Sequence, residues 1–202
     1  MSDPTCVPNH HAHHAGFSGV SGVVAALSML GRGGDARFAV RLAAVEPDDT
    51  VVDIGCGPGA AVRRAAALGA TALGVDPARV MLRVARLFTH KNTVRYLEGT
   101  AEAIPLADDS ATVLWSIATV HHWKDIDRGL AEARRVLRPG GRFVAIERHT
   151  EPGARGLASH GWTAAQAEAF VEQCRAHGFV DPRIDHNTDG KRTTIAVTGA
   201  AP

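Results

Sequence analysis

The chain has 202 residues, with 22 Lys or Arg, 21 Asp or Glu and 45% hydrophobic residues, and its formal net charge is +1. This length suits one domain with a substantial core, and ordinary apolar content with little net charge argues against disorder. The three Cys lack CxxC spacing, so neither a disulfide framework nor a cysteine zinc site is indicated. The evenly scattered Arg residues argue against a nucleic-acid partner.

The N-terminal part, residues 1–46, differs from the rest and is expected to form a His-rich tail followed by lid or cap helices. Residues 1–31 contain no Lys or Arg, and the apolar run 17–30 is broken by Gly and Ser. It is shorter than the ~20 residues of a membrane-spanning helix. We therefore expect a cytoplasmic protein without a secretory signal and without stable membrane insertion.

Four histidines lie close together in the tail: His10, His11, His13 and His14. Neutral imidazole is the commonest ligand for metals such as Zn²⁺. No Cys or carboxylate lies at ligand spacing, and nothing in the segment stiffens it. We therefore predict that residues 1–15 are mobile, with adventitious metal affinity and no built metal site, and that they could fold over a cleft as a lid.

From residue 50 onward, apolar runs of strand length alternate with stretches of helical period. After a helix expected near residues 35–45, this alternation predicts strands at 50–54, 71–75, 94–97, 111–118, 142–146 and 193–197, with 183–186 as an antiparallel partner of the last. Helices are expected at 59–68, around 80–88, at 125–137 and at 163–177. Such a βαβ series implies parallel strands, right-handed crossovers and helices on both faces of the sheet. We predict a doubly wound α/β core over residues 47–202.

A glycine-rich loop follows the first predicted strand and could serve either of two cofactor classes. Gly55, Gly57 and Ala60 satisfy the dinucleotide pattern G-x-G-x-x-G/A, and Asp76 follows Gly55 by 21 residues, near the spacing of a ribose-binding acid. That pattern alone is weak evidence for a nicotinamide cofactor.

Two neighbouring residues favour a different ligand. Asp53 lies two positions before the first glycine, where a pyrophosphate would meet a like charge. Pro58 removes one N–H from a loop that would otherwise bind phosphate through its N–H groups. The loop therefore suits a cationic amino-acid nucleoside better than a dinucleotide.

Several segments, in order, resemble the motifs of class I S-adenosylmethionine-dependent methyltransferases. Residues 51–59 (VVDIGCGPG) resemble the first motif, 74–78 (GVDPA) the second, and 98–108 (EGTAEAIPLAD) the segment after the third strand. Residues 121–123 (HHW) and 135–143 (RVLRPGGRF) resemble landmarks of the type 11, menaquinone-methyltransferase-like branch. The resemblance implies a Rossmann-like sheet of order 3-2-1-4-5-7-6 with an antiparallel last strand, S-adenosylmethionine as cofactor and S-adenosylhomocysteine as product.

The resemblance also implies cofactor contacts for Asp53, Gly55, Gly57, Gly59, Asp76, Pro77, Thr100, Ala101, Glu102 and Ser116. The glycines would line the methionine and ribose, with Asp53 near the amino group and Asp76 accepting from the ribose hydroxyls. Ala101 and Glu102 would lie at the adenine edge. Many relatives have Asp where this chain has Thr100, so the contact to the adenine amino group is expected to be weaker or rearranged.

Methyl transfer from a sulfonium is an in-line displacement that requires no particular catalytic side chain. A base is needed for a neutral hydroxyl, an ammonium or a carbon acid, and His121 is the candidate. The alternative is that His121 and His122 only begin a structural helix.

The expected acceptor is a small molecule, because residues 116–123 (SIATVHHW) lack the Asn-Pro-Pro-aromatic element of methyltransferases acting on bases or glutamine. Apolar residues in segments 17–46 and 149–162 would suit a lipophilic acceptor, although helix-to-sheet packing also explains them. An NAD(P)-binding oxidoreductase and a non-catalytic cofactor-binding module remain alternatives. The acceptor, the methylated atom and the oligomeric state stay open.

Overall fold

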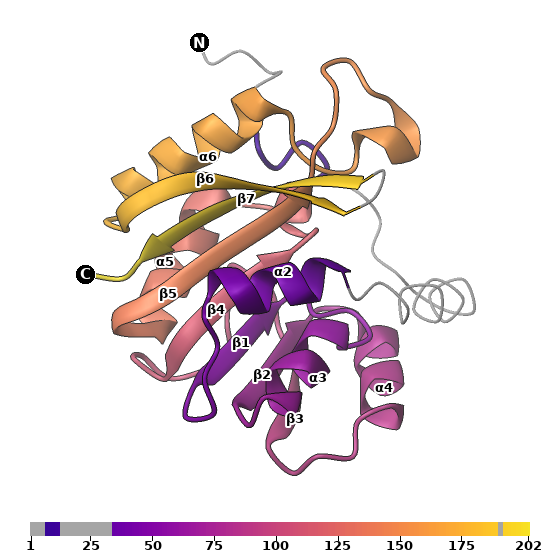
Figure 1. Ribbon diagram of the computed structural model, residues 1–202, viewed down its shortest axis with the longest axis vertical. Coiled ribbons are helices and arrows are strands. Elements are labelled where there is room, and N and C mark those ends of the chain that lie inside the picture. The colour runs from indigo at the N-terminus through magenta and orange to yellow at the C-terminus, as the bar shows by residue number, and fades with distance from the viewer. Residues whose placement is uncertain (1–6, 13–33, 190–191) are drawn as a thin grey trace.

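The structure, a computed structural model, describes residues 7–12, 34–189 and 192–202 (Figure 1). These residues form a seven-stranded sheet of order β3-β2-β1-β4-β5-β7-β6. Strands β1 to β5 pair in parallel, and β7 is antiparallel to both β5 and β6. The predicted doubly wound sheet, its order and its antiparallel last strand are confirmed.

The strands are β1 (Thr50–Ile54), β2 (Thr71–Asp76), β3 (Val94–Glu98), β4 (Ala111–Ile117), β5 (Leu137–Arg148), β6 (Val180–Asp189) and β7 (Arg192–Ala200). The helices are α2 (Gly34–Leu42), α3 (Ala60–Ala67), α4 (Arg79–Leu87), α5 (Ile126–Val136) and α6 (Ala164–Ala176), with short 3-10 helices η2 (Val120–His122) and η3 (Gly156–Ser159). No helix of the described ranges is long and apolar enough to cross a membrane.

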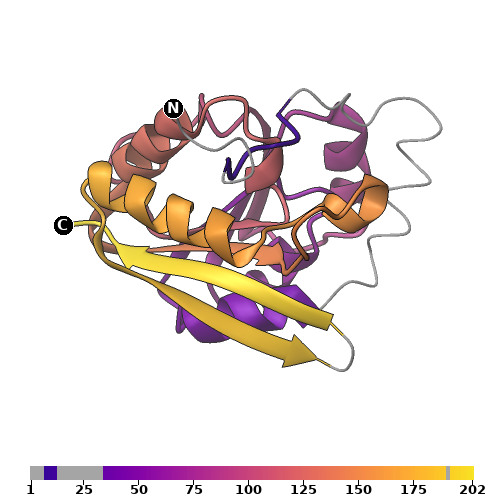
Figure 2. The same cartoon turned by 90° about the horizontal axis from the view of Figure 1, so that it is seen from above.

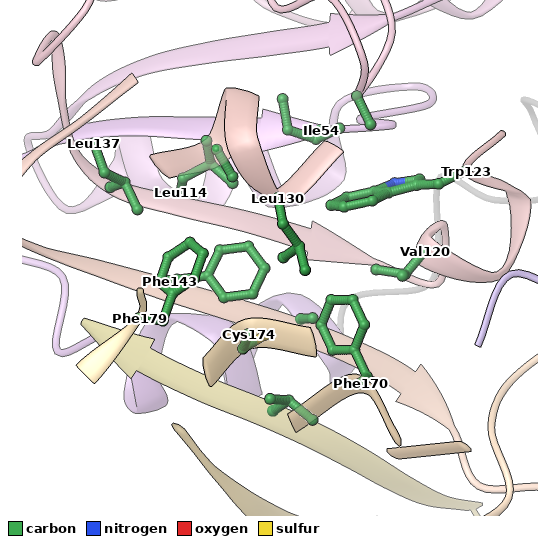
Figure 3. Close-up of a cluster of buried hydrophobic side chains, with 14 of the residues drawn as sticks. Ile54, Leu114, Val120, Trp123, Leu130, Leu137, Phe143, Phe170, Cys174 and Phe179 are labelled. Atoms are coloured by element: carbon green, nitrogen blue, oxygen red, sulfur yellow. The ribbon is translucent and has the colours of Figure 1, made fainter. Parts of the chain in front are cut away.

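Helices cover both faces of the sheet, because the central strands are apolar on both sides. Buried side chains of α2, α3 and α4 pack on one face. Those of α5 and α6 pack on the other, where Phe143 of β5 lies among Leu130, Phe170 and Phe179 (Figure 3). The expected helix near residues 35–45 is α2, which packs on the sheet beside α3. The other expected cap residues, 17–33, lie outside the described part of the chain.

Strand β5 begins earlier than the sequence predicts. The sequence predicts a helix that ends at residue 137 and a strand that starts at Arg142. Instead, Leu137 already pairs with Ala111, and the register shifts before Val113 pairs with Arg142. This register shift is a β-bulge, and a contact with a distant part of the chain stabilises it. Gly140 has a φ of 75°, and its N–H donates to the carbonyl of Ala201 at 2.9 Å.

Helix α6 has a reciprocal cap at its N-terminus. The Thr163 hydroxyl accepts from the N–H of Gln166 at 3.3 Å, and the Gln166 side chain accepts from the N–H of Thr163 at 2.9 Å. Thr163→Ala leaves an N–H without its cap, and we expect a loss of about 1 kcal/mol of unfolding free energy. Urea titration followed by circular dichroism measures this loss. Glu168→Ala, on an exposed position of the same helix, is the control, and equal stability of both variants would contradict the cap's contribution.

Candidate functional site

The glycine loop after β1 is folded around the carboxyl end of β2. The N–H groups of Gly55 and Cys56 bond the carbonyl of Val75 at 2.8 and 3.1 Å. One carboxylate oxygen of Asp76 accepts the N–H of Gly57 at 2.8 Å, and the other accepts the N–H of Ala78 at 2.8 Å. Asp76 thus fixes the loop between β1 and α3, and each of its oxygens has a further lone pair for a ligand.

The three glycines of the loop have different surroundings, although all have positive φ. A Cβ on Gly55 would lie 2.5 Å from the side chain of Thr119, and one on Gly59 would lie 2.2 Å from the Tyr96 hydroxyl. A Cβ on Gly57 would meet nothing within 4 Å. The backbone of Gly57 therefore borders open space, as a ligand that passes close to the loop requires.

Two carboxyl groups are buried at the ends of β1 and β2. Burial raises the pKa of Asp53 well above its ordinary value, and the nearby charge of Asp76 raises it further. Burial also raises the pKa of Asp76, and its hydrogen bonds from Ala78 and Gly57 partly offset this effect. Two buried, mutually repelling carboxyl groups favour a ligand that carries positive charge.

Ser116 lies at the end of β4 and is linked to the glycine loop through Thr119. Its hydroxyl is 2.5 Å from the hydroxyl of Thr119, which donates to the carbonyl of Ile54 at 3.0 Å. The structure thus brings Ser116 to the edge of the sheet that carries Asp53 and Asp76.

The other predicted cofactor contacts follow β3, at Thr100, Ala101 and Glu102, or β2, at Pro77. Ala101 is buried in the core, Thr100 pairs with Ala103 in an isolated bridge, and Pro77 is exposed. The carboxylate of Glu102 accepts the N–H of Lys124 at 2.7 Å, so it holds the loop before α5. Their cofactor contacts stay predictions.

His121, the candidate base, is paired with a buried carboxylate. Its Nδ1 lies 2.8 Å from Oε2 of Glu147, and its backbone N–H donates to Oε1 at 3.3 Å. His121 is 2% exposed and Glu147 is 0% exposed. The Nε2 atom of His121 is buried and has no hydrogen-bond partner among the described residues. This arrangement orients an imidazole with one nitrogen available to accept a proton or bind a metal.

Residues 7–12 are docked against this part of the molecule, which differs from the predicted mobile tail (Figure 2). The N–H of His11 donates to the carbonyl of His121 at 2.9 Å, and the indole of Trp162 donates to the carbonyl of Pro8 at 2.9 Å. The amide of Gln166 donates to the carbonyl of Val7 at 3.1 Å. The segment is held because its backbone carbonyls accept hydrogen bonds from the side chains of Trp162 and Gln166. The amino-acid composition of the segment gives no sign of these contacts. His13 and His14 lie outside the described residues.

The docked segment brings further histidines beside His121. The His11 ring stacks on the His160 ring with centroids 4.3 Å apart, and the rings of His121 and His122 are 4.1 Å apart. Burial, followed by the neighbouring His121, lowers the pKa of His122 to about 4. His122 is therefore a neutral imidazole at pH 7.

Four residues of the site were missed by the sequence analysis. Thr119 and Tyr96 contact the glycine loop, and Glu147 and His160 complete the surroundings of His121. Glu147 had a detectable signal, because it is a carboxylate directly after the apolar run of a predicted central strand. The other three had none, since their positions depend on how loops return to the edge of the sheet.

Comparison with known proteins gives a family match over the middle of the chain. Residues 52–145 match the family described as "Methyltransferase domain". The chain is 29% identical over 124 residues to the uncharacterized methyltransferase YcgJ of Bacillus subtilis, covering 60% of this chain and 49% of that protein. It is 36% identical over 111 residues to the ubiquinone/menaquinone biosynthesis C-methyltransferase UbiE of Rubrivivax gelatinosus, covering 55% of this chain and 44% of that protein. These matches thus span about half the length of the two relatives.

The solved structures agree on the fold. A SAM-dependent methyltransferase from Aquifex aeolicus superposes with a TM-score of 0.70 at 18% identity, over 87% of this chain and 93% of that one. The matched family and the seven-stranded sheet of order 3-2-1-4-5-7-6 lead to one assignment. Residues 52–145 thus belong to the class I S-adenosylmethionine-dependent methyltransferases, in their type 11 branch.

Proposed function

We propose that this protein transfers a methyl group from S-adenosylmethionine to a small-molecule acceptor by in-line displacement. The observation that carries the proposal is the pair of buried carboxyl groups, Asp53 and Asp76, beside an open glycine loop. S-adenosylmethionine has an ammonium and a sulfonium group, and two buried carboxylates favour such a cation.

The surroundings of Asp76 and Gly57 support this cofactor. Asp76 has a free lone pair on each oxygen after binding the loop, so it can accept the ribose hydroxyls. Gly57 has no atom within 4 Å of the position of a Cβ, which leaves room for the methionine part along the loop. We propose the remaining predicted contacts on the ground of family resemblance alone; they are Gly55, Gly59, Pro77, Thr100, Ala101, Glu102 and Ser116.

The cofactor supplies an activated methyl group whose leaving group is a neutral thioether. The chain then has to hold the acceptor in line with the methyl group and exclude water. Residues 7–12 and 149–162 lie beside the carboxyl edge of the sheet, where they would enclose the acceptor. The acceptor's lipophilic character and a cytoplasmic location stay predictions, as does a domain boundary after residue 46.

The test is turnover with a methyl-labelled cofactor. Purified protein is incubated with methyl-labelled S-adenosylmethionine and pools of small hydroxyl, thiol, amine and activated-carbon compounds, and products are identified by mass spectrometry. We expect label in one chemical class, formation of S-adenosylhomocysteine in equal amount, and a marked decrease in both with Asp76→Ala at subsaturating cofactor. Transfer to no pool at saturating cofactor would contradict the proposal and favour the non-catalytic module. The matches do not favour the oxidoreductase alternative.

A further inference from the structure

Three imidazoles converge at the carboxyl edge of the sheet, outside the cofactor contacts described above. His121 and His122 belong to η2, and His160 follows η3. Each residue offers one ring nitrogen, and these three nitrogens all lie within 4.8 Å of one another. The first two come from the segment after β4 and the third from the loop between β5 and α6, so the fold, and no local sequence pattern, brings them together.

His121, the most buried of the three, has one ring nitrogen oriented by a carboxylate and the other available for a ligand. Glu147 engages the Nδ1 atom of His121 and so directs the other ring nitrogen, Nε2, away from the carboxylate. That Nε2 is buried and has no hydrogen-bond partner among the residues that the structure describes. A buried polar atom without a partner costs free energy, which a bound ion would recover. A histidine oriented by a carboxylate is the usual arrangement around protein-bound zinc.

The spacing suits a transition-metal ion. In a tetrahedral site with Zn–N bonds of about 2.0–2.1 Å, the ligand nitrogens lie about 3.3 Å apart. The three nitrogens lie within 4.8 Å of one another, so side-chain rotations would have to bring them closer. His122 and His160 are only partly buried and lie in short or irregular segments, which makes such rotations easy. Imidazole ligands favour Zn²⁺ over Mg²⁺ or Ca²⁺, which prefer oxygen.

We propose that His121, His122 and His160 bind one Zn²⁺ ion through a ring nitrogen each, with Glu147 orienting His121. Three protein ligands leave a fourth position open to water or to another small ligand. The site goes beyond the methyltransferase function and does not depend on it. It also goes beyond the sequence predictions, which expected no built metal site and made His121 a candidate base.

A neighbouring segment supports the site without supplying its ligands. The ring of His11 stacks on His160, and the Nε2 atom of His11 lies 3.0 Å from the Ser159 hydroxyl. His10 contacts the carbonyl of Ser159 at 2.9 Å. These contacts hold the loop that carries His160 next to η2. The first ligand, His121, follows Thr119 by two positions in the sequence. Thr119 in turn packs against Gly55 of the cofactor loop.

The test measures bound metal in the full chain, purified without an affinity tag. Chelator-treated protein is reconstituted with Zn²⁺, desalted and analysed by elemental mass spectrometry, and affinity is measured by calorimetry. We expect one equivalent of Zn²⁺ per chain. His160→Ala is expected to weaken binding by about 100-fold or more, and Glu147→Gln, which alters only the orienting group, by about 10- to 100-fold.

Two control variants distinguish this site from other histidines. His90→Ala changes an exposed residue before β3 and is expected to leave binding unchanged. Replacing His13 and His14 together by Ala is likewise expected to leave binding unchanged. Absence of bound Zn²⁺ in the wild type, full binding by His160→Ala, or loss of the ion in the tail variant would each overturn the proposal.

A spectroscopic measurement on the wild type covers the case in which His160→Ala does not fold. Co²⁺ substituted at a tetrahedral imidazole site gives strong visible absorption bands, whereas hydrated octahedral Co²⁺ gives weak ones. We expect the strong bands to develop up to one equivalent and to disappear when Zn²⁺ is added. Weak bands only, in folded protein, would overturn the site.

Discussion

Replacement of Asp76 by Ala is expected to weaken binding of S-adenosylmethionine by about 10- to 150-fold. The variant loses charge-assisted hydrogen bonds to the ribose hydroxyls, for which a cost of about 1.5–3 kcal/mol is typical. It also releases the N–H of Gly57, which Asp76 holds at 2.8 Å, so the glycine loop is less well ordered before the cofactor binds. Titration calorimetry with wild type and variant measures the change.

Two further variants control for the cause of this loss. Asp48→Ala removes an exposed carboxylate in the loop before β1 and is expected to leave affinity unchanged. Asp76→Asn keeps the shape and one acceptor oxygen but removes the charge, and we expect an intermediate loss. Wild-type affinity in a folded Asp76→Ala variant would contradict the assignment of Asp76 to the cofactor site.

The largest expected loss of stability follows from Phe170→Ala. Phe170 is fully buried on α6, with its ring centroid 4.8 Å from that of Trp162 and 6.3 Å from that of Phe143. Removing this ring from a packed aromatic cluster forfeits its transfer free energy and leaves a cavity, which typically costs about 3–5 kcal/mol. Chemical unfolding monitored by tryptophan fluorescence and circular dichroism measures the difference.

The matched control is Leu157→Ala, because Leu157 is 85% exposed in η3. Its expected effect lies within about 0.5 kcal/mol of zero. A loss below about 1 kcal/mol for Phe170→Ala would mean that α6 does not pack on the sheet as described. The result also matters for the site, because α6 carries Gln166, whose amide holds the carbonyl of Val7.

The sheet and the cofactor loop were predictable because their signals are local. Residues 50–54 form a β-branched run that ends at Gly55, and Asp76 ends the next strand at a recognisable spacing. The strand order came from family resemblance, since hydrophobic patterns give strands and helices but not their lateral arrangement. Strand β5 was misplaced at its start because the hydrogen bond from Gly140 to Ala201 joins residues far apart in the sequence.

The histidine cluster was not predictable from the sequence. In the sequence, the histidines of the tail and those at 121 and 122 lie far apart, and each group has its own explanation. Their proximity depends on Pro8, whose carbonyl accepts from Trp162, and on the loop that returns His160 to the edge of the sheet. Glu147 links the cluster to the core, because its carboxylate lies on β5, directly after the apolar run of that strand, and pairs with His121.

The most direct test of the central claim is calorimetric titration of the wild-type chain with S-adenosylmethionine and then with S-adenosylhomocysteine. If the carboxyl groups of Asp53 and Asp76 and the open glycine loop form the cofactor site, both compounds bind with 1:1 stoichiometry, and each excludes the other. Absence of binding by either compound, in protein shown to be folded, would contradict the cofactor assignment and with it the proposed methyl transfer.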